Sequence, residues 1–198
     1  MLHPDRALLW PAQRTVFIAD LHMGKDEIFR RSGILIPQGT TETDLRRLQN
    51  IVEAHGVARV VLLGDFLHGA SPQAPTHAGL FDRWRAAHSA VDFIVIAGNH
   101  DRRAARNELM GVQWEDRGLR LGPFLCRHQP PSAADRGYVL CGHVHPMVRL
   151  EGPHRERARV PACWVQDHYV VLPSFGSFTG GADIEGGAGG TVFAFAAG

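Results

Sequence analysis

Runs of consecutive apolar residues alternate with amphipathic stretches along the first half of the chain. The runs, at residues 14–19, 59–63 and 93–97, are short and rich in β-branched side chains, which is typical of strands buried on both faces. Between them, apolar residues recur at helical spacing within 40–55 and 80–87. The first of these helices has hydroxyl caps available around Thr40 and is expected to end at Gly56. The order strand, helix, strand, helix, strand predicts crossover connections and parallel pairing.

The pattern changes after Val112, where short strands follow one another with turns between them and no helical periodicity intervenes. This half is therefore expected to be largely antiparallel. The glycine-rich stretch 180–190 is expected to form a flexible loop before the last strand. No repeat, charge block or proline-rich linker divides the sequence, so residues 1–198 are expected to form one domain. The strands predicted in this half cover residues 122–127, 138–141, 147–150, 159–165, 168–172 and 191–195.

Composition narrows the classes of function. The 198 residues carry 21 Lys+Arg and 20 Asp+Glu, a net charge of +1, which falls short of the basic surplus of a dedicated nucleic-acid binder. No apolar run approaches the ~18 residues of a membrane span, and the start of the chain lacks the pattern of a signal peptide. The three cysteines form no C-x-x-C pair. We therefore expect a cytoplasmic protein with reduced thiols and no membrane contact.

Asp, Asn and His residues follow five of the predicted strands directly. In open α/β sheets ligands gather beyond the carboxyl ends of strands, and all three residue types ligate metals. Residues two apart in an extended segment point the same way, so each Asp-x-His or His-x-His pair is expected to face one metal centre. Glycines at 64, 98 and 142 would allow the backbone to turn sharply and approach closely. The set exceeds what one ion needs, and two ions sharing a bridging carboxylate would use it. Its members are Asp20, His22, Asp65, Asn99, His100, Asp101, His128, His143 and His145.

Individually these motifs are weak. Taken alone, each short motif is more often the turn that ends a strand than part of a metal site. The ordered set of motifs is what predicts a metal centre. His68, three residues after Asp65, is a candidate neighbour of the site, whereas the remaining histidines are expected at surfaces or helix ends. Cys126 and Cys141 each precede a histidine by two residues. They would either bring a thiolate near the metals or pack as buried hydrophobes.

The order Asp-x-His, Gly-Asp, Gly-Asn-His-Asp, His and Gly-His-x-His, from Asp20 to His145, resembles the signature of the calcineurin-like metallophosphoesterases. A narrower resemblance is to the ligase-associated DNA damage response endonucleases of the PdeM type, which are manganese-dependent and cut single-stranded DNA. The resemblance implies an α/β fold bordering on α+β, a sandwich of two mixed β-sheets flanked by helices. The segments that carry the narrower resemblance are 19–25, 30–33, 36–41, 64–68 and 172–181.

The resemblance also implies a dinuclear centre. His100 would be the histidine that faces the scissile phosphate without binding a metal, and Asp101 would position it. A mixed nitrogen and oxygen ligand set without thiolate suits Mn²⁺ or similar ions better than Mg²⁺, so two divalent ions, Mn²⁺ above all, are the expected cofactors. By similarity, one ion would be held by Asp20, His22, Asp65 and His145, and the second by Asp65, Asn99, His128 and His143, with Asp65 bridging.

Single-stranded DNA is the substrate that the narrower resemblance implies. The genes of that group belong to repair clusters that also encode a DNA ligase, a helicase and an exonuclease. A homodimer is an alternative to a monomer. Phe175 and Phe178 would stack bases, or else serve the core or a dimer contact. Candidate phosphate contacts, which would otherwise be solvated helix faces, are Lys25, Arg102 and Arg103, with Arg30, Arg31 and Arg106 near them in the sequence.

Two other functions compete with a DNA endonuclease. One is a phosphatase or phosphodiesterase acting on a small nucleotide or phosphoester. The other is a catalytically silent protein that keeps the fold as an interaction scaffold. The scaffold predicts lost ligand residues, and every ligand position is filled in this sequence.

Overall fold

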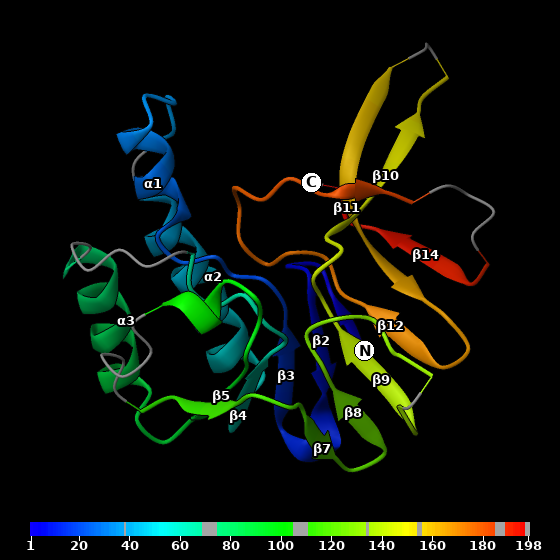
Figure 1. Cartoon of the computed structure of the whole chain (residues 1–198), viewed down its shortest axis with the longest axis horizontal. Helices are drawn as coiled ribbons and strands as arrows, with labels where there is room; N and C mark the ends of the chain where they lie inside the picture. The colour runs from blue at the N-terminus through cyan, green and yellow to red at the C-terminus, as the bar shows by residue number, and fades with distance from the viewer. Residues whose placement is uncertain are drawn as a thin grey trace.

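Two β-sheets lie face to face, and helices cover the outer face of the first sheet (Figure 1). This computed structural model describes residues 1–37, 39–68, 75–104, 111–133, 135–153, 156–184 and 189–196, with only the backbone at 75–78 and 103. The layers confirm the predicted fold class, a sandwich of two mixed sheets with flanking helices. None of the described helices is long and apolar enough to cross a membrane.

The first sheet has a parallel core, as the strand and helix alternation predicts. Its strand order is β1-β2-β3-β4-β5-β6, and β3 through β6 pair in parallel. The hairpin β1–β2 adds to the free edge of β3 in antiparallel orientation, and the sequence pattern did not predict it. The strands are β1 (Leu2–His3), β2 (Ala7–Trp10), β3 (Thr15–Ile18), β4 (Arg59–Leu62), β5 (Asp92–Ile96) and β6 (Gln113–Glu115).

Helices α2 (Thr40–Ala54) and α3 (Pro75–Ala87) pack on one face of this sheet. Leu48 and Ile51 of α2 are fully buried there, as the spacing of apolar residues predicts. The predicted hydroxyl cap is wrong: α2 begins after Gly39, whose φ is 80°, without a side-chain cap. Instead Thr41 Oγ1 donates to Asp26 of the short helix α1 (Lys25–Arg31), which ties the two helices together. Two 3₁₀ turns, η1 (Pro11–Gln13) and η2 (Asp101–Arg103), complete the helical elements described.

The second sheet is mixed rather than largely antiparallel. β9 pairs in parallel with both β8 and β12. The pairing with β12 is parallel because the chain leaves β9 to form the long hairpin β10–β11 and returns beside β9 only at β12. The stretch 180–190, expected as a loop, contains the short strand β13, which pairs with β10; residues 185–188 lie outside the described part. The strand order is β13-β10-β11-β12-β9-β8-β7, with β14 on β11. The strands are β7 (Leu119–Leu121), β8 (Phe124–Cys126), β9 (Tyr138–Cys141), β10 (Pro146–Glu151), β11 (Arg157–Val165), β12 (Tyr169–Val171), β13 (Ala182–Asp183) and β14 (Thr191–Ala194).

An apolar layer fills the space between the two sheets. The two sheets contribute side chains to one buried cluster. The first sheet and the residues after its strands provide Phe17, Val61 and Leu63, and the second provides Leu140 and Leu172. This packing places the loops after β3, β4 and β5 against those after β8 and β9. The polar residues that follow these strands therefore meet at one edge of the sandwich.

Candidate metal centre

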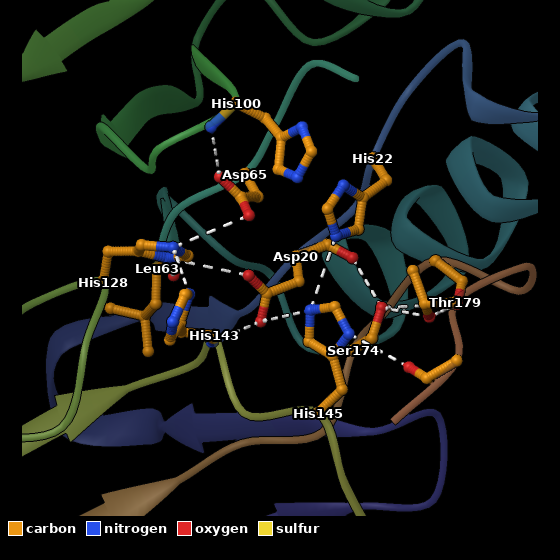
Figure 2. Close-up of polar contacts among 12 residues, drawn as sticks. Asp20, His22, Leu63, Asp65, His100, His128, His143, His145, Ser174 and Thr179 are labelled. Atoms are coloured by element: carbon orange, nitrogen blue, oxygen red, sulfur yellow. Dashed lines mark hydrogen bonds and ion pairs between the residues drawn. The ribbon is translucent and has the colours of Figure 1, made fainter. Parts of the chain in front are cut away.

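The loops after β3, β4, β8 and β9 bring six of the predicted ligands into two adjacent groups (Figure 2). Within each group, one ligand atom per residue lies within 4.8 Å of the others. The two residues of the predicted His-x-His pair join different groups, which is the division that the family resemblance implies. The groups are Asp20, His22 and His145, and Asp65, His128 and His143.

In the first group two imidazoles converge beside one carboxylate. His22 Nε2 lies 3.4 Å from His145 Nε2, and the latter lies 3.5 Å from Asp20 Oδ2. Asp20 is fully buried and His22 nearly so. Burial, together with the charge of Lys25, lowers the pKa of His22, so this imidazole is neutral at neutral pH and has a lone pair for a cation.

The second group is centred on His128. Its Nε2 lies 2.9 Å from His143 Nδ1, 3.0 Å from Asn99 Oδ1 and 3.6 Å from Asp65 Oδ2. His128 also connects the groups, since its Nδ1 lies 3.6 Å from Asp20 Oδ1. Asn99 therefore lies beside the second group, where the resemblance expects it.

Backbone carbonyls fix the orientation of two of the rings. His145 Nδ1 lies 3.0 Å from the Gly180 oxygen, and His128 Nδ1 lies 3.2 Å from the Leu63 oxygen. A carbonyl can only accept, so each Nδ1 carries a proton, and each Nε2 is left facing the group as the atom that an ion would bind. Histidines that bind metals show this arrangement, because the second hydrogen bond sets both the tautomer and the direction of the ring.

The backbone at the ligands is left-handed rather than extended, so the predicted alternation along an extended segment is wrong. Asp20 and His22 both have φ of 50°, Asp65 has 46°, and His143 and His145 have 69° and 49°. Asp and His enter this region more readily than most residues with a side chain, yet it is still unfavourable for them. Strained conformations of this kind persist where the surrounding structure holds them, and they gather at functional sites.

Glycines make room for the ligand side chains, as the sequence predicts. A Cβ on Gly64 would overlap the ring of His128, and one on Gly98 would overlap the carboxylate of Asp65. A Cβ on Gly142 would lie against Asp20 in the same way. The ligands therefore approach the backbone of neighbouring loops more closely than any residue with a side chain would allow.

The donor set fits divalent cations. Asp20 Oδ1 is buried and accepts no hydrogen bond from the residues that the structure describes, as expected of an oxygen that binds a cation. Two donor atoms each about 2.1 Å from a common ion lie roughly 3–3.4 Å apart in octahedral or tetrahedral geometry. The separations of 2.9–3.6 Å between facing nitrogen and oxygen atoms are close to this range.

Two further histidines adjoin the first group. The ring of His68 stacks on that of His100 with centroids 4.6 Å apart, and His68 Nδ1 lies 3.1 Å from His22 Nδ1. The expectation that His68 is a neighbour of the site is therefore met. Burial, with the charges of His100 and Lys25, lowers the pKa of His68 to about 4, so its ring is neutral at neutral pH.

Asp101 holds the backbone of two ligand loops. Its buried carboxylate accepts from the amides of Phe66 and Leu67, after Asp65, and from the amide of Gly98, before His100. The His100 amide in turn donates to Asp65 Oδ1 at 3.0 Å. Asp101 thus joins the turns that carry Asp65 and His100. These contacts are with backbone amides, and the positioning of the His100 imidazole by Asp101 stays a prediction.

A loop from the C-terminal part of the chain supports the first group from behind. Ser174 Oγ donates to the Asp20 carbonyl at 2.6 Å, and Gly180 accepts from His145. Helix α2 anchors this loop through Asp44, which accepts from both the amide and the hydroxyl of Ser177. The residue pattern did not reveal these supports, because they join positions 35 to 154 residues apart.

The segment of the chain that carries this geometry matches a known family. The family model described as calcineurin-like phosphoesterase matches residues 13–185, which include both groups and every loop described above.

The chain is a calcineurin-like phosphoesterase.

Among solved structures, this phosphoesterase is similar to the nuclease MPE of Pseudomonas putida, with 34% identity and a TM-score of 0.84 over 98% of this chain and 90% of that one. A protein of unknown function from Aquifex aeolicus, AQ665, is 18% identical with a TM-score of 0.45, over 66% of this chain and 78% of that one. The phosphoesterase Yfce of E. coli is 16% identical with a TM-score of 0.45, over 81% and 79%. No curated protein matches in sequence.

Two candidate phosphate contacts of this phosphoesterase line different pockets beside the metal centre. Lys25 lines a pocket that also includes His22, whereas Arg102 lines a different pocket beside Asn99 and His128. Burial lowers the pKa of Lys25, while the carboxylates of the two groups act in the opposite direction. The side chain of Arg103 and all of residues 105–110, including position 106, lie outside the described part.

The aromatic and cysteine candidates divide between core and surface. Phe175 is fully buried beneath the guanidinium of Arg47, so it serves the core, whereas Phe178 is 37% exposed and lines the Lys25 pocket.

Cys126 and Cys141 are fully buried in apolar clusters. Burial raises the pKa of Cys126 to about 12 and that of Cys141 further, which matches packing rather than thiolate chemistry.

Proposed function

We propose that this phosphoesterase is a phosphodiester hydrolase that cuts single-stranded DNA with two divalent ions, Mn²⁺ above all. The proposal depends chiefly on one observation: every donor of a dinuclear site converges at one edge of the sandwich, with no position lost. The similarity to a nuclease over 98% of the chain supports nucleic acid as the substrate class. In this proposal residues 1–198 act as a single domain.

The six grouped residues and Asn99 would hold the ions, with Asp65 between the two groups. When bound, two such ions neutralise charge on a phosphate and lower the pKa of a water that attacks it. The left-handed turns and the carbonyl-bound imidazoles keep the donor atoms together before any ion enters. The reorganisation that ion binding requires is therefore small.

In this proposal His100 acts on the substrate and does not hold an ion, although its ring lies close enough to His22 and His68 to form a third group of potential ligands. Its amide is fixed by Asp65, and its ring stacks on His68 beside His22. Cleavage of a phosphodiester develops negative charge on the leaving sugar oxygen, and that oxygen needs a proton. A histidine in this position would donate it, a contribution of about 10²–10⁴-fold to the rate.

The neutral ring of His68 has a supporting role in this scheme. Stacked at 4.6 Å, it restricts the rotation of His100 and shields one face of that ring from water.

The same proposal places the protein in cytoplasmic DNA repair, in functional association with a DNA ligase, a helicase and an exonuclease. Whether one chain or a homodimer acts there is decided by the mass of the active species in solution.

Circular single-stranded DNA provides the test of this function. The purified protein with Mn²⁺ is expected to linearise it, and chelation or Asp65→Ala is expected to abolish both cleavage and metal uptake. Hydrolysis of a phenyl phosphate ester without any cleavage of DNA would favour the small-substrate phosphoesterase. Absence of both activities in a metal-loaded protein would favour the scaffold.

A further inference from the structure

A second pocket opens beside the metal centre on the side of His128. It is open to solvent, and the 480 Å³ of space within it includes that opening. His128 of the second metal group and its neighbour Asn99 both line this pocket. A substrate whose reacting phosphate lies at the metal centre could therefore extend directly into the pocket.

Cations dominate the wall of this pocket. Three guanidinium groups line it, from Arg102 after β5, Arg117 in the turn between β6 and β7, and Arg127 after β8, against one carboxylate from Asp116. These residues come from three separate loops, so the charge is not the solvated face of one helix. A guanidinium presents five N–H donors in a planar fork that matches the oxygens of a phosphate.

The turn at Gly118 is shaped around one of these side chains. Gly118 has φ of 96°, and a Cβ there would lie 2.7 Å from Arg127 Cδ. Arg127 Nη1 donates to Asp135 Oδ1 at 2.7 Å, which holds the guanidinium along the turn. The stem of Arg127 is therefore fixed before any ligand arrives.

We infer that this arginine pocket binds a phosphate of the substrate strand next to the one that is cut. The inference rests on the proposed function, because it assumes a polynucleotide at the metal centre. The ligand is a singly charged phosphodiester, or a terminal phosphate in the same position. A small phosphoester has no such second phosphate, so the pocket favours polymers over the small substrates that the metal centre alone would accept.

Arg117→Gln is the variant of choice, since Arg117 is exposed and lies outside the metal groups. We expect its KM for circular single-stranded DNA to rise about tenfold. The slope of log KM against log salt is expected to fall by about 0.7, the value for one lost phosphate contact on a single strand. Hydrolysis of bis-p-nitrophenyl phosphate, which has no flanking phosphate, is expected to stay at the wild-type rate.

Arg157→Gln is the matched control. Arg157 pairs with Glu151 near the tip of the β10–β11 hairpin, five residues beyond Pro146, and so about 15–20 Å along the hairpin from the metal centre. This variant loses the same charge, and its KM for DNA is expected to change less than twofold.

The substrate distinguishes the two sources of phosphate. A raised KM on circular DNA indicates an internal phosphate, and an effect confined to 5′-phosphorylated oligonucleotides indicates a terminal one. An unchanged KM on every DNA substrate, or an equal loss on DNA and on bis-p-nitrophenyl phosphate, would overturn the inference. If the wild-type protein cuts no DNA, the proposed function fails instead, and that result is read before any variant is compared. Arg102→Gln repeats the test from a second loop.

Discussion

Removal of the Asp44 carboxylate tests whether the loop of residues 174–180 keeps the metal-binding side chains in position. Asp44 is 4% exposed and accepts from the Ser177 amide at 2.9 Å, the Ser177 hydroxyl, and Arg47 Nη1 at 3.0 Å. Hydrogen bonds to a charged acceptor contribute about 1.5–3 kcal/mol each. Burial raises the pKa of Asp44, so desolvation of the charge offsets a large part of that gain.

We therefore expect Asp44→Ala to lower the free energy of unfolding by about 2–4 kcal/mol, measured by urea denaturation in excess chelator. The loop that holds Ser174 against Asp20 and Gly180 against His145 would loosen with it. Loss of such outer supports typically weakens metal binding by about 10–100-fold, which calorimetric titration with Mn²⁺ would measure on the folded variant.

The control is Glu42→Ala on the same helix. Glu42 and Arg46 form an exposed pair, with 57% and 64% of their side-chain surface accessible, so the change should cost less than about 0.5 kcal/mol and leave Mn²⁺ affinity as it was. A large loss of stability in Asp44→Ala with wild-type Mn²⁺ affinity would refute the reasoning. It would mean that the loop braces the fold and not the ligands.

Three further outcomes follow from the geometry of the site. His100→Gln should keep Mn²⁺ uptake but lose about 10²–10⁴-fold in the turnover of DNA, and an unchanged rate in a stopped assay would remove this ring from the chemistry. Gly64→Ala forces a methyl group into the ring of His128, so Mn²⁺ affinity should fall while Gly33→Ala, at an equally left-handed glycine in open space, leaves it unchanged. Burial acts against protonation of His145, yet the Asp20 carboxylate outweighs it and the pKa of His145 is raised above 6.5. An ion must displace that proton, so Mn²⁺ affinity should be weaker at pH 6 than at pH 8, with proton release visible in buffers of different ionisation enthalpy.

The ligand residues could be predicted because the signal for them is local. A buried strand, a polar residue at its end and a glycine beside it lie within a few positions of one another, as at Gly64 and Asp65. Parallel strands then bring such ends together without any knowledge of distant contacts. The family resemblance supplied the division between the two groups, which local spacing alone had assigned differently for His143 and His145.

The rest depended on contacts that no local pattern encodes. The hairpin β1–β2 joins the first sheet because the edge of β3 is free, and residue pattern does not show a free edge. Asp44 and Ser177 are 133 positions apart, and the arginine pocket draws on three loops. The backbone conformation of the ligands was predicted wrongly for a related reason, since packing of the loops overrides the extended conformation that spacing suggests.

The left-handed backbone at five ligands bears on how inactive variants of this enzyme will behave. A residue with a side chain in that region is disfavoured by about 1 kcal/mol or more relative to glycine, so the metal-free fold holds five positions at odds with their own backbone preference. Replacing the exposed His143 by glycine should therefore relieve strain in the metal-free protein while removing a ligand, whereas at buried His22 the loss of packing opposes that gain. The His143→Gly protein is expected to be well folded and at least as heat-resistant as the wild type, but without activity. Activity and fold stability draw in opposite directions at this position, and a screen for thermal stability alone would select against the metal centre.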